Sequence, residues 1–303
     1  MTCFRRLLLV VLLGSVIPAA AENDDRFADV EIKTTGLTDS LAMLEGSGGN
    51  LVVGWGGDGI FLVDDQYAPL TKKILAAVAE LADGPVRFVF NTHWHGDHTG
   101  GNENLGESGS LIFSHANVRR RLSTDQFTAV WDRTTPAAPE VALPVITFTD
   151  SLTFHLNGDE VHIFHVPHAH TDGDGVLHFT AANVIHTGDL VFYGLYPYID
   201  VSAGGSIDGM IAGVRTVLDL CDEQTKIVPG HGPLLGREEL VIYLEMLEGV
   251  RREVAEARQG GSDLATVQAG NPAAPWDEAW GQVWLTSDQF VESVYTSLDG
   301  PGH

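Results

Sequence analysis

The segment His93-Trp94-His95-Gly96-Asp97-His98 places three imidazoles and one carboxylate within six residues. Imidazole nitrogens and carboxylate oxygens are good ligands for divalent ions such as zinc. Gly96 lets the backbone turn tightly, so that side chains on both sides of it can converge. An apolar strand predicted at Val86 to Asn91 ends just before the segment. The spacing therefore predicts a metal site on a loop that leaves the C-terminal end of a strand.

Three later motifs also carry histidine or aspartate, namely His170-Thr171, Thr187-Gly188-Asp189 and Pro229-Gly230-His231-Gly232. In this order, and together with the first segment, they resemble the motif set of the metallo-β-lactamase superfamily over nearly the whole mature chain. The resemblance implies an α/β (α+β) fold, an αββα four-layer sandwich with metals in the cleft between the two sheet edges. The order of predicted elements, strands then helices then strands then helices, independently favours two packed sheets with helices outside.

The resemblance implies seven ligands for two metals: His93, His95 and His170 at the first, Asp97, His98 and His231 at the second, and Asp189 as a bridge. His168 is the alternative to His170, but the family pattern puts threonine directly after the ligand, which favours His170. Asp64 matches an acidic strand-end position of the family and is predicted to orient a ligand imidazole. His186 directly precedes the Thr187 motif and is predicted to support a ligand without binding metal.

Two such ions, zinc with iron or manganese as alternatives, would make a hydrolase that needs no serine or cysteine nucleophile. A metal pair lowers the pKa of bound water toward neutrality and polarises a substrate carbonyl. Asp97 is the predicted catalytic residue, placed to orient the shared hydroxide and accept its proton. The expected reaction is hydrolysis of a β-lactam, lactone, ester or thioester.

The choice among these substrates is left open by two conflicting comparisons. Asp189 resembles the glyoxalases and lactonases of the superfamily, whereas export and His98 resemble the β-lactamase subclass whose second site lacks a cysteine ligand. The stretch from Gly188 to Asp200 resembles exported members mostly of unassigned substrate. Its tyrosines, Tyr193, Tyr196 and Tyr198, are predicted either to line the pocket mouth and contact substrate or to pack beneath a loop.

Two functions of other classes use the same ligands. In one, the residues hold iron for oxygen or persulfide chemistry, which imidazole and carboxylate do not exclude. In the other, the chain is a non-catalytic metal-binding protein. The open bridging position argues against the second, because structural zinc sites are normally closed and usually contain cysteine.

The N-terminus predicts export to the periplasm or beyond the cell. Arg5-Arg6 is followed by an apolar run from Leu7 to Ile17 and by Ala19-Ala20-Ala21, typical of a signal peptide over residues 1–21. An uncleaved anchor is the alternative, although the run is shorter than the roughly 20 residues that a membrane span needs. Cleavage would leave one domain over residues 22–303, with Cys221 as its lone cysteine.

The charge balance restricts the partners. With 17 basic and 41 acidic residues the formal net charge is −24, which disfavours nucleic acid and anionic membranes. We therefore expect a small-molecule substrate and no stable membrane association after signal cleavage. The stretch from Thr124 to Pro144 is rich in threonine, alanine and proline without periodicity, and is predicted to be a loop insertion near the site or a disordered surface loop.

Overall fold

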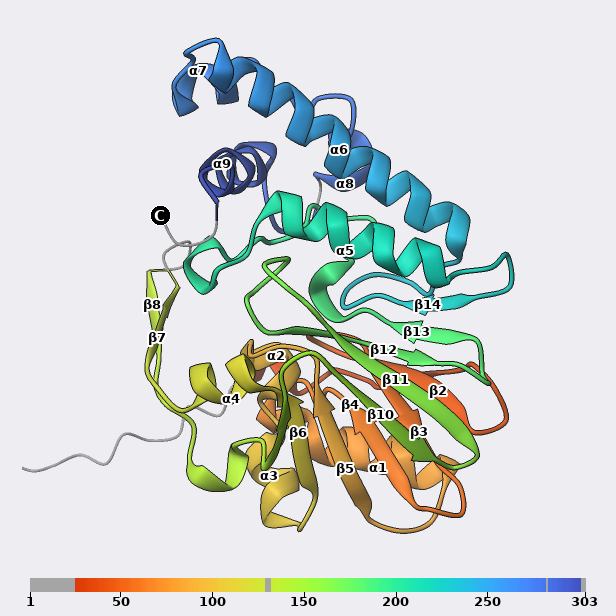
Figure 1. Ribbon diagram of the computed structural model, residues 1–303. Coiled ribbons are helices and arrows are strands. Elements are labelled where there is room, and N and C mark those ends of the chain that lie inside the picture. The colour runs from red at the N-terminus through yellow and green to blue at the C-terminus, as the bar shows by residue number, and fades with distance from the viewer. Residues whose placement is uncertain (1–24, 129–131, 282, 301–303) are drawn as a thin grey trace, which may run out of the picture.

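The computed structural model describes residues 25–128, 132–281 and 283–300. Within these residues two β-sheets pack face to face, and helices cover both outer faces (Figure 1). This is the αββα sandwich expected from the motif order, so the predicted fold class is confirmed. The predicted signal peptide, residues 1–21, lies outside the described residues and stays a prediction.

The first sheet has seven strands in the order β1-β2-β3-β4-β5-β6-β9 within the described residues. Their bounds are β1 (Lys33–Gly36), β2 (Leu41–Glu45), β3 (Leu51–Gly54), β4 (Ile60–Val63), β5 (Val86–Asn91), β6 (Leu111–His115) and β9 (Ile146–Phe148). The first four strands form an antiparallel meander, and β4, β5, β6 and β9 run parallel. Every residue of β4, Ile-Phe-Leu-Val, is buried, as expected for a strand covered on both faces.

The second sheet has the order β10-β11-β12-β13-β14 in the described part of the chain. Its strands are β10 (Ser151–Leu156), β11 (Asp159–Val166), β12 (Asp174–Phe179), β13 (Val184–His186) and β14 (Lys226–Val228). The first four are antiparallel, and β14 returns parallel to β13. Parallel β13 and β14 therefore end at the same edge of the sheet, which sets their following loops side by side.

Helices form the two outer layers. The described helices are α1 (Thr71–Leu81), α2 (Gly96–Thr99), α3 (Asn102–Glu107), α4 (Ala116–Leu122), α5 (Ile207–Leu220), α6 (Arg237–Gln259), α7 (Leu264–Ala269), α8 (Asp277–Trp280) and α9 (Ser287–Ser297). Apolar residues of α1, such as Ile74 and Val78, pack on the first sheet, and α5, α6 and α9 cover the second (Figure 1). Between the sheets lie Phe61, Phe90 and Phe179. No described helix is long and apolar enough to cross a membrane.

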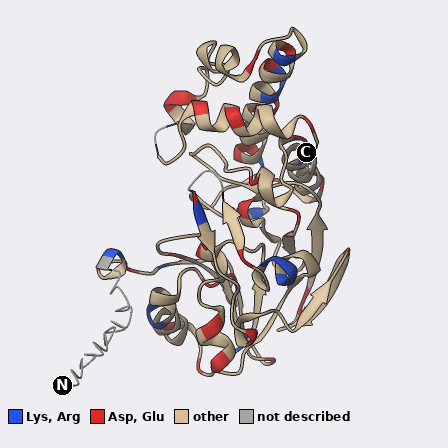
Figure 2. Cartoon of the chain, turned by 90° about the vertical axis from the view of Figure 1, so that its left-hand side faces the viewer, with Lys and Arg blue, Asp and Glu red and all other residues tan. Residues whose placement is uncertain are grey.

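The insertion at 124–144 differs from its predicted loop structure. Within it, β7 (Gln126–Thr128) pairs antiparallel with β8 (Arg133–Thr135), a hairpin that stands at one edge of the sandwich (Figure 1). The β-branched threonines favour strand. Each strand has only three residues, too short for the alternation by which strands are recognised in sequence. Figure 2 shows acidic residues on elements in both halves of the molecule, outnumbering the basic ones.

Candidate metal centre

The seven predicted ligands come together at one edge of the sandwich, where several strands end. They are His93 and His95 on the loop after β5, Asp97 and His98 in α2, His170 between β11 and β12, Asp189 in the 3-10 helix η5 (Gly188–Leu190) after β13, and His231 after β14. Of the two histidines that compete between β11 and β12, His168 is exposed and its Nδ1 contacts the Gly204 carbonyl. The structure places His170, not His168, in the cluster.

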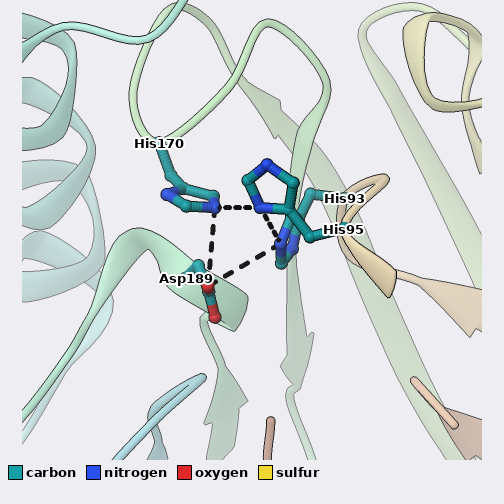
Figure 3. Close-up of side chains that lie close together, drawn as sticks. All are labelled: His93, His95, His170 and Asp189. Atoms are coloured by element: carbon teal, nitrogen blue, oxygen red, sulfur yellow. Dashed lines mark hydrogen bonds and ion pairs between the residues drawn. The ribbon is translucent and has the colours of Figure 1, made fainter. Parts of the chain in front are cut away.

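The first group consists of His93, His95, His170 and Asp189, whose ligand atoms all lie within 4.8 Å of one another (Figure 3). His95 Nδ1 lies 3.1 Å from His93 Nε2 and 2.8 Å from His170 Nε2. On His95 and His170 the other ring nitrogen already bonds an acceptor, Asp200 Oδ2 or the Tyr198 carbonyl. When these rings are neutral, their remaining lone pairs therefore point at a common centre.

The second group consists of Asp97, His98 and His231. His231 Nε2 lies 3.3 Å from Asp97 Oδ2 and 3.4 Å from His98 Nε2. The side chain of His98 is fully buried, while those of Asp97 and His231 are about one fifth exposed. This half of the centre is therefore the one more open to solvent.

Asp189 joins the two groups through its two carboxylate oxygens. Oδ2 lies 3.4 Å from His170 Nε2 in the first group, and Oδ1 lies 3.0 Å from His98 Nε2 in the second. Burial alone raises the pKa of Asp189, but the surrounding imidazoles, led by those of His98 and His231, outweigh it and hold the pKa well below its usual value. The carboxylate is thus anionic and faces both groups.

Observations beyond the residue types also indicate that this cluster fits a pair of divalent ions. Oδ1 of Asp189 is buried and accepts no hydrogen bond from any described residue, a costly state that a bound cation removes. The backbone also leaves no room for side chains beside the ligands: a Cβ at Gly49 would collide with the His98 ring, and one at Gly230 with Asp189 Oδ1. Five imidazoles and two carboxylates supply nitrogen and oxygen donors suited to zinc.

Asp64, at the end of β4, lies beside ligands of both groups. Its Oδ2 accepts hydrogen bonds from His98 Nδ1 at 2.7 Å and from the Thr92 hydroxyl at 2.8 Å, and Thr92 Oγ1 lies 3.1 Å from His93 Nδ1. Because Thr92 donates to Asp64, its oxygen is free to accept from His93. Asp64 adopts a left-handed φ of 62°, which aspartate tolerates better than most residues. These contacts place Asp64 beside the ligand histidines, and its orienting role stays a prediction.

His186 supports the centre through the backbone. Its Nδ1 accepts the Gly188 N–H at 3.1 Å, and its Nε2 lies 3.2 Å from the Asn50 carbonyl. Burial lowers the pKa of His186, so the ring is neutral and can accept at one nitrogen while donating at the other. The ring therefore holds the turn that carries Asp189.

Asp200 is a further supporting carboxylate that sequence reasoning did not single out. Its Oδ2 lies 2.9 Å from His95 Nε2, and its Oδ1 accepts from Ser202 Oγ at 2.6 Å. Burial alone raises the pKa of Asp200, but the hydrogen bond and charge of His95 outweigh it and, with the Ser202 bond, lower the pKa to about 2. A ligand imidazole usually donates its second N–H to such an acceptor. The signal available in the sequence was that each predicted ligand histidine needs a hydrogen-bond acceptor for its second ring nitrogen.

We expect Asp200→Asn to weaken zinc binding roughly tenfold, because the loss of charge leaves His95 less basic and less firmly oriented. Competition with a chromophoric zinc chelator measures the affinity directly. Asp208→Asn is the matched control, since Asp208 pairs with Arg251 on the surface of α5. Equal zinc affinity in the Asp200 variant and the control would show that Asp200 does not tune the site.

The three tyrosines predicted to contact substrate separate in the structure. Tyr198 lies beside the first group, with ring centroids 5.8 Å from both His95 and His170. The other two are corrections: Tyr196 is fully buried with its hydroxyl bonded to Asp277 and the Ala273 carbonyl, and Tyr193 packs edge-on against Trp280. Tyr196 fills the core under the C-terminal helices, and Tyr193 is partly buried against the same core, because that apolar layer needs large side chains to close it.

A cleft of about 650 Å³ opens at the centre, within the size range of small-molecule sites. The residues that line it are Arg26, Phe27, Tyr67, Ala68, Pro69, Trp94, His95, Gly96, Asp97, Gly100, Thr128, Arg133, Thr135, Asp189, Tyr198 and Trp284. Thr128, Arg133 and Thr135 belong to the β7–β8 hairpin, so the insertion forms part of the wall.

A four-layer αββα sandwich with a histidine and aspartate cluster at its edge defines the class of the protein, a metal-binding enzyme fold. The family model of the metallo-beta-lactamase superfamily matches residues 38–233, and the chain belongs to this superfamily. Membership and the cluster together support a metal-dependent hydrolase.

Individual relatives are distant. A type 2 metallo-beta-lactamase of Bacteroides fragilis is 26% identical over 75% of this chain and 90% of its own length. A hydroxyacylglutathione hydrolase of Pelagibacter ubique is 26% identical over 48% of this chain and 52% of its own length. Among solved structures, the stereoselective inverting sec-alkylsulfatase Pisa1 of Pseudomonas sp. aligns with a TM-score of 0.67 at 14% identity, over 89% of this chain and 50% of that chain. At that identity the likeness shows the fold alone.

Proposed function

We propose that the protein is an exported dizinc hydrolase that cleaves a small lactam, lactone, ester or thioester. The observation that carries the proposal is Asp189, whose two oxygens face two separate groups of imidazoles. A carboxylate in that position is suited to hold two ions close together. Of the three proteins compared above, two are named for a lactam and for an acyl-glutathione, which supports a carbonyl substrate, and the third is a sulfatase that is similar in fold.

His93, His95 and His170 would hold one ion, Asp97, His98 and His231 the other, and Asp189 both. When bound, such a pair lowers the pKa of the water that it binds and polarises a carbonyl oxygen.

Asp97 is the residue of the centre best placed to move a proton. Its carboxylate lines the cleft and remains 22% exposed, whereas Asp189 is almost completely covered. Burial alone raises the pKa of Asp97, but His98 and His231 outweigh it and lower the pKa below its usual value. Asp97 is therefore ionised at neutral pH and can accept a proton from a water molecule in the cleft.

The described cysteine takes no part in this chemistry. Cys221 ends α5 away from the cleft, its Sγ donates to the Val217 carbonyl, and burial raises its pKa to about 11. A thiol in that state is a poor nucleophile at neutral pH.

A substrate screen of the purified zinc protein tests the proposal. We expect turnover of at least one of nitrocefin, an acyl-homoserine lactone and an S-acylglutathione, abolished by chelator and restored by added zinc, because the metals supply the Lewis acid and the acidified water. Bis-p-nitrophenyl phosphate and a secondary alkyl sulfate are the comparison substrates. Metal-dependent turnover confined to the phosphodiester or the sulfate ester, or iron in place of zinc by elemental analysis, would contradict it.

A further inference from the structure

The cleft carries an unexpected charge for so acidic a chain. Apart from the metal ligands Asp97 and Asp189, no described residue lining it is acidic, whereas two, Arg26 and Arg133, are basic. The whole chain has 41 acidic and only 17 basic residues. Once cations occupy the centre, the ligand carboxylates are neutralised and both ends of the cleft are positive.

Both arginines come from segments added to the layered sandwich. Arg26 lies in the 3-10 helix η1 (Asp25–Phe27), before the first strand, and Arg133 begins β8 of the inserted hairpin. These segments, 107 residues apart in sequence, meet across one cleft. Two segments remote in sequence therefore bring a positive charge each to the wall of the same cleft.

Tyr67 links the arginines to the metal end. The Arg26 guanidinium lies over the rings of Phe27 and Tyr67, with its Cζ 4.5 Å and 5.2 Å from their centroids. Tyr67 lines the same cleft as Arg26, Arg133 and the metal ligand Asp97, so the arginines and the metal centre share one continuous cleft.

Arg133 is available to a ligand. Its side chain is exposed and forms no hydrogen bond or ion pair with any described residue. The same cleft is also lined by aromatic and apolar side chains that include Pro69, Trp94 and Trp284. A guanidinium matches the planar oxygens of a carboxylate or sulfonate, and aromatic walls match an apolar body.

We propose that Arg133 and Arg26 form an anion-recognition end of the cleft, so that the substrate is an organic anion with an apolar body between its scissile carbonyl and its carboxylate or sulfonate. This inference rests on the proposed function for the carbonyl, but the anion site itself does not depend on turnover. It also explains how an enzyme with a formal charge of −24 retains an anionic substrate that its surface repels.

The test uses two esters that differ only in the far terminal group, a carboxylate in mono-4-nitrophenyl glutarate and a methyl in 4-nitrophenyl valerate. In the zinc enzyme, Arg133→Gln should raise KM for the glutarate ester roughly 5- to 20-fold, the loss expected for a charge-assisted contact at a partly exposed site. The valerate ester should keep its kcat/KM within about twofold, which also shows that the variant is folded. Arg26→Gln should act in the same direction, and added salt should weaken the preference for the glutarate ester.

Arg252→Gln is the matched control, because Arg252 is an exposed arginine of α6 paired with Glu253. A parallel calorimetric titration with 2-phenylethanesulfonate measures anion binding without catalysis. No turnover of either ester, with sulfonate binding that Arg133→Gln weakens, would count against an ester substrate and keep the anion site; the hydrolase assignment itself is tested by the substrate screen. Equal effects of Arg133→Gln and Arg252→Gln on both esters and on sulfonate binding would overturn the anion site.

Discussion

Replacing Asp189 with asparagine is expected to lower zinc content from about two equivalents per chain to one or fewer, and kcat by on the order of 10³-fold or more. The two side chains have nearly the same volume, so the change removes mainly the negative charge. That charge lies 3.0 Å from His98 Nε2 and 3.4 Å from His170 Nε2. Without it, two cations would face one another across a neutral amide, and one of them should be lost.

Elemental analysis after dialysis against metal-free buffer measures the zinc, and a progress curve on the substrate identified by the screen measures the rate. Asp208→Asn is again the control, because it removes the same charge from the surface of α5. The far-ultraviolet circular dichroism of the Asp189 variant should match the control in zinc buffer. Two retained zinc equivalents with normal turnover would disprove the bridging role.

The second large effect is expected for Asp97→Asn, which should reduce kcat by roughly 10²–10⁴-fold. The substitution removes an anionic ligand from the second group and the proton acceptor that lines the cleft. Asp97 Oδ2 lies 3.3 Å from His231 Nε2, so the loss also removes one of the two carboxylates beside that imidazole, the other being Asp189 at 3.5 Å. The first group does not contain Asp97, so at least about one zinc equivalent should remain.

The two variants therefore differ in a measurable way. In the Asp97→Asn variant, activity should fall by a larger factor than zinc content. In the Asp189→Asn variant, activity and zinc content should fall together. Titrating zinc back into the Asp97 variant separates its two roles: a rate that stays low at full occupancy identifies the proton acceptor, and a rate that recovers assigns Asp97 to metal binding alone. Near-native turnover of the Asp97 variant without added zinc would remove it from the chemistry.

The fold and the superfamily were both predictable from the order of four short motifs, and both predictions are confirmed. Four of the seven donors lie in the segment from His93 to His98, both included. Their spacing can be recognised in the sequence because residues so close along the chain can point at one centre. Zinc as the metal, export and the identity of the substrate stay predictions. Export depends on the cell, and the metal and the substrate depend on binding affinities that the spacing of residues does not encode.

The tertiary structure alone decided which other side chains reach the centre. Asp200 lies 105 residues from His95 along the chain and 2.9 Å from it in space, a contact without a local pattern. Tyr196 and Tyr198 are two residues apart in one segment, yet one fills the core and the other lies beside the ligand histidines. Likewise, Arg26 and Arg133 share a cleft only because a hairpin of two three-residue strands stands at the sandwich edge. Side-chain periodicity records which residues avoid water, whereas contacts between distant segments follow from how the whole core packs.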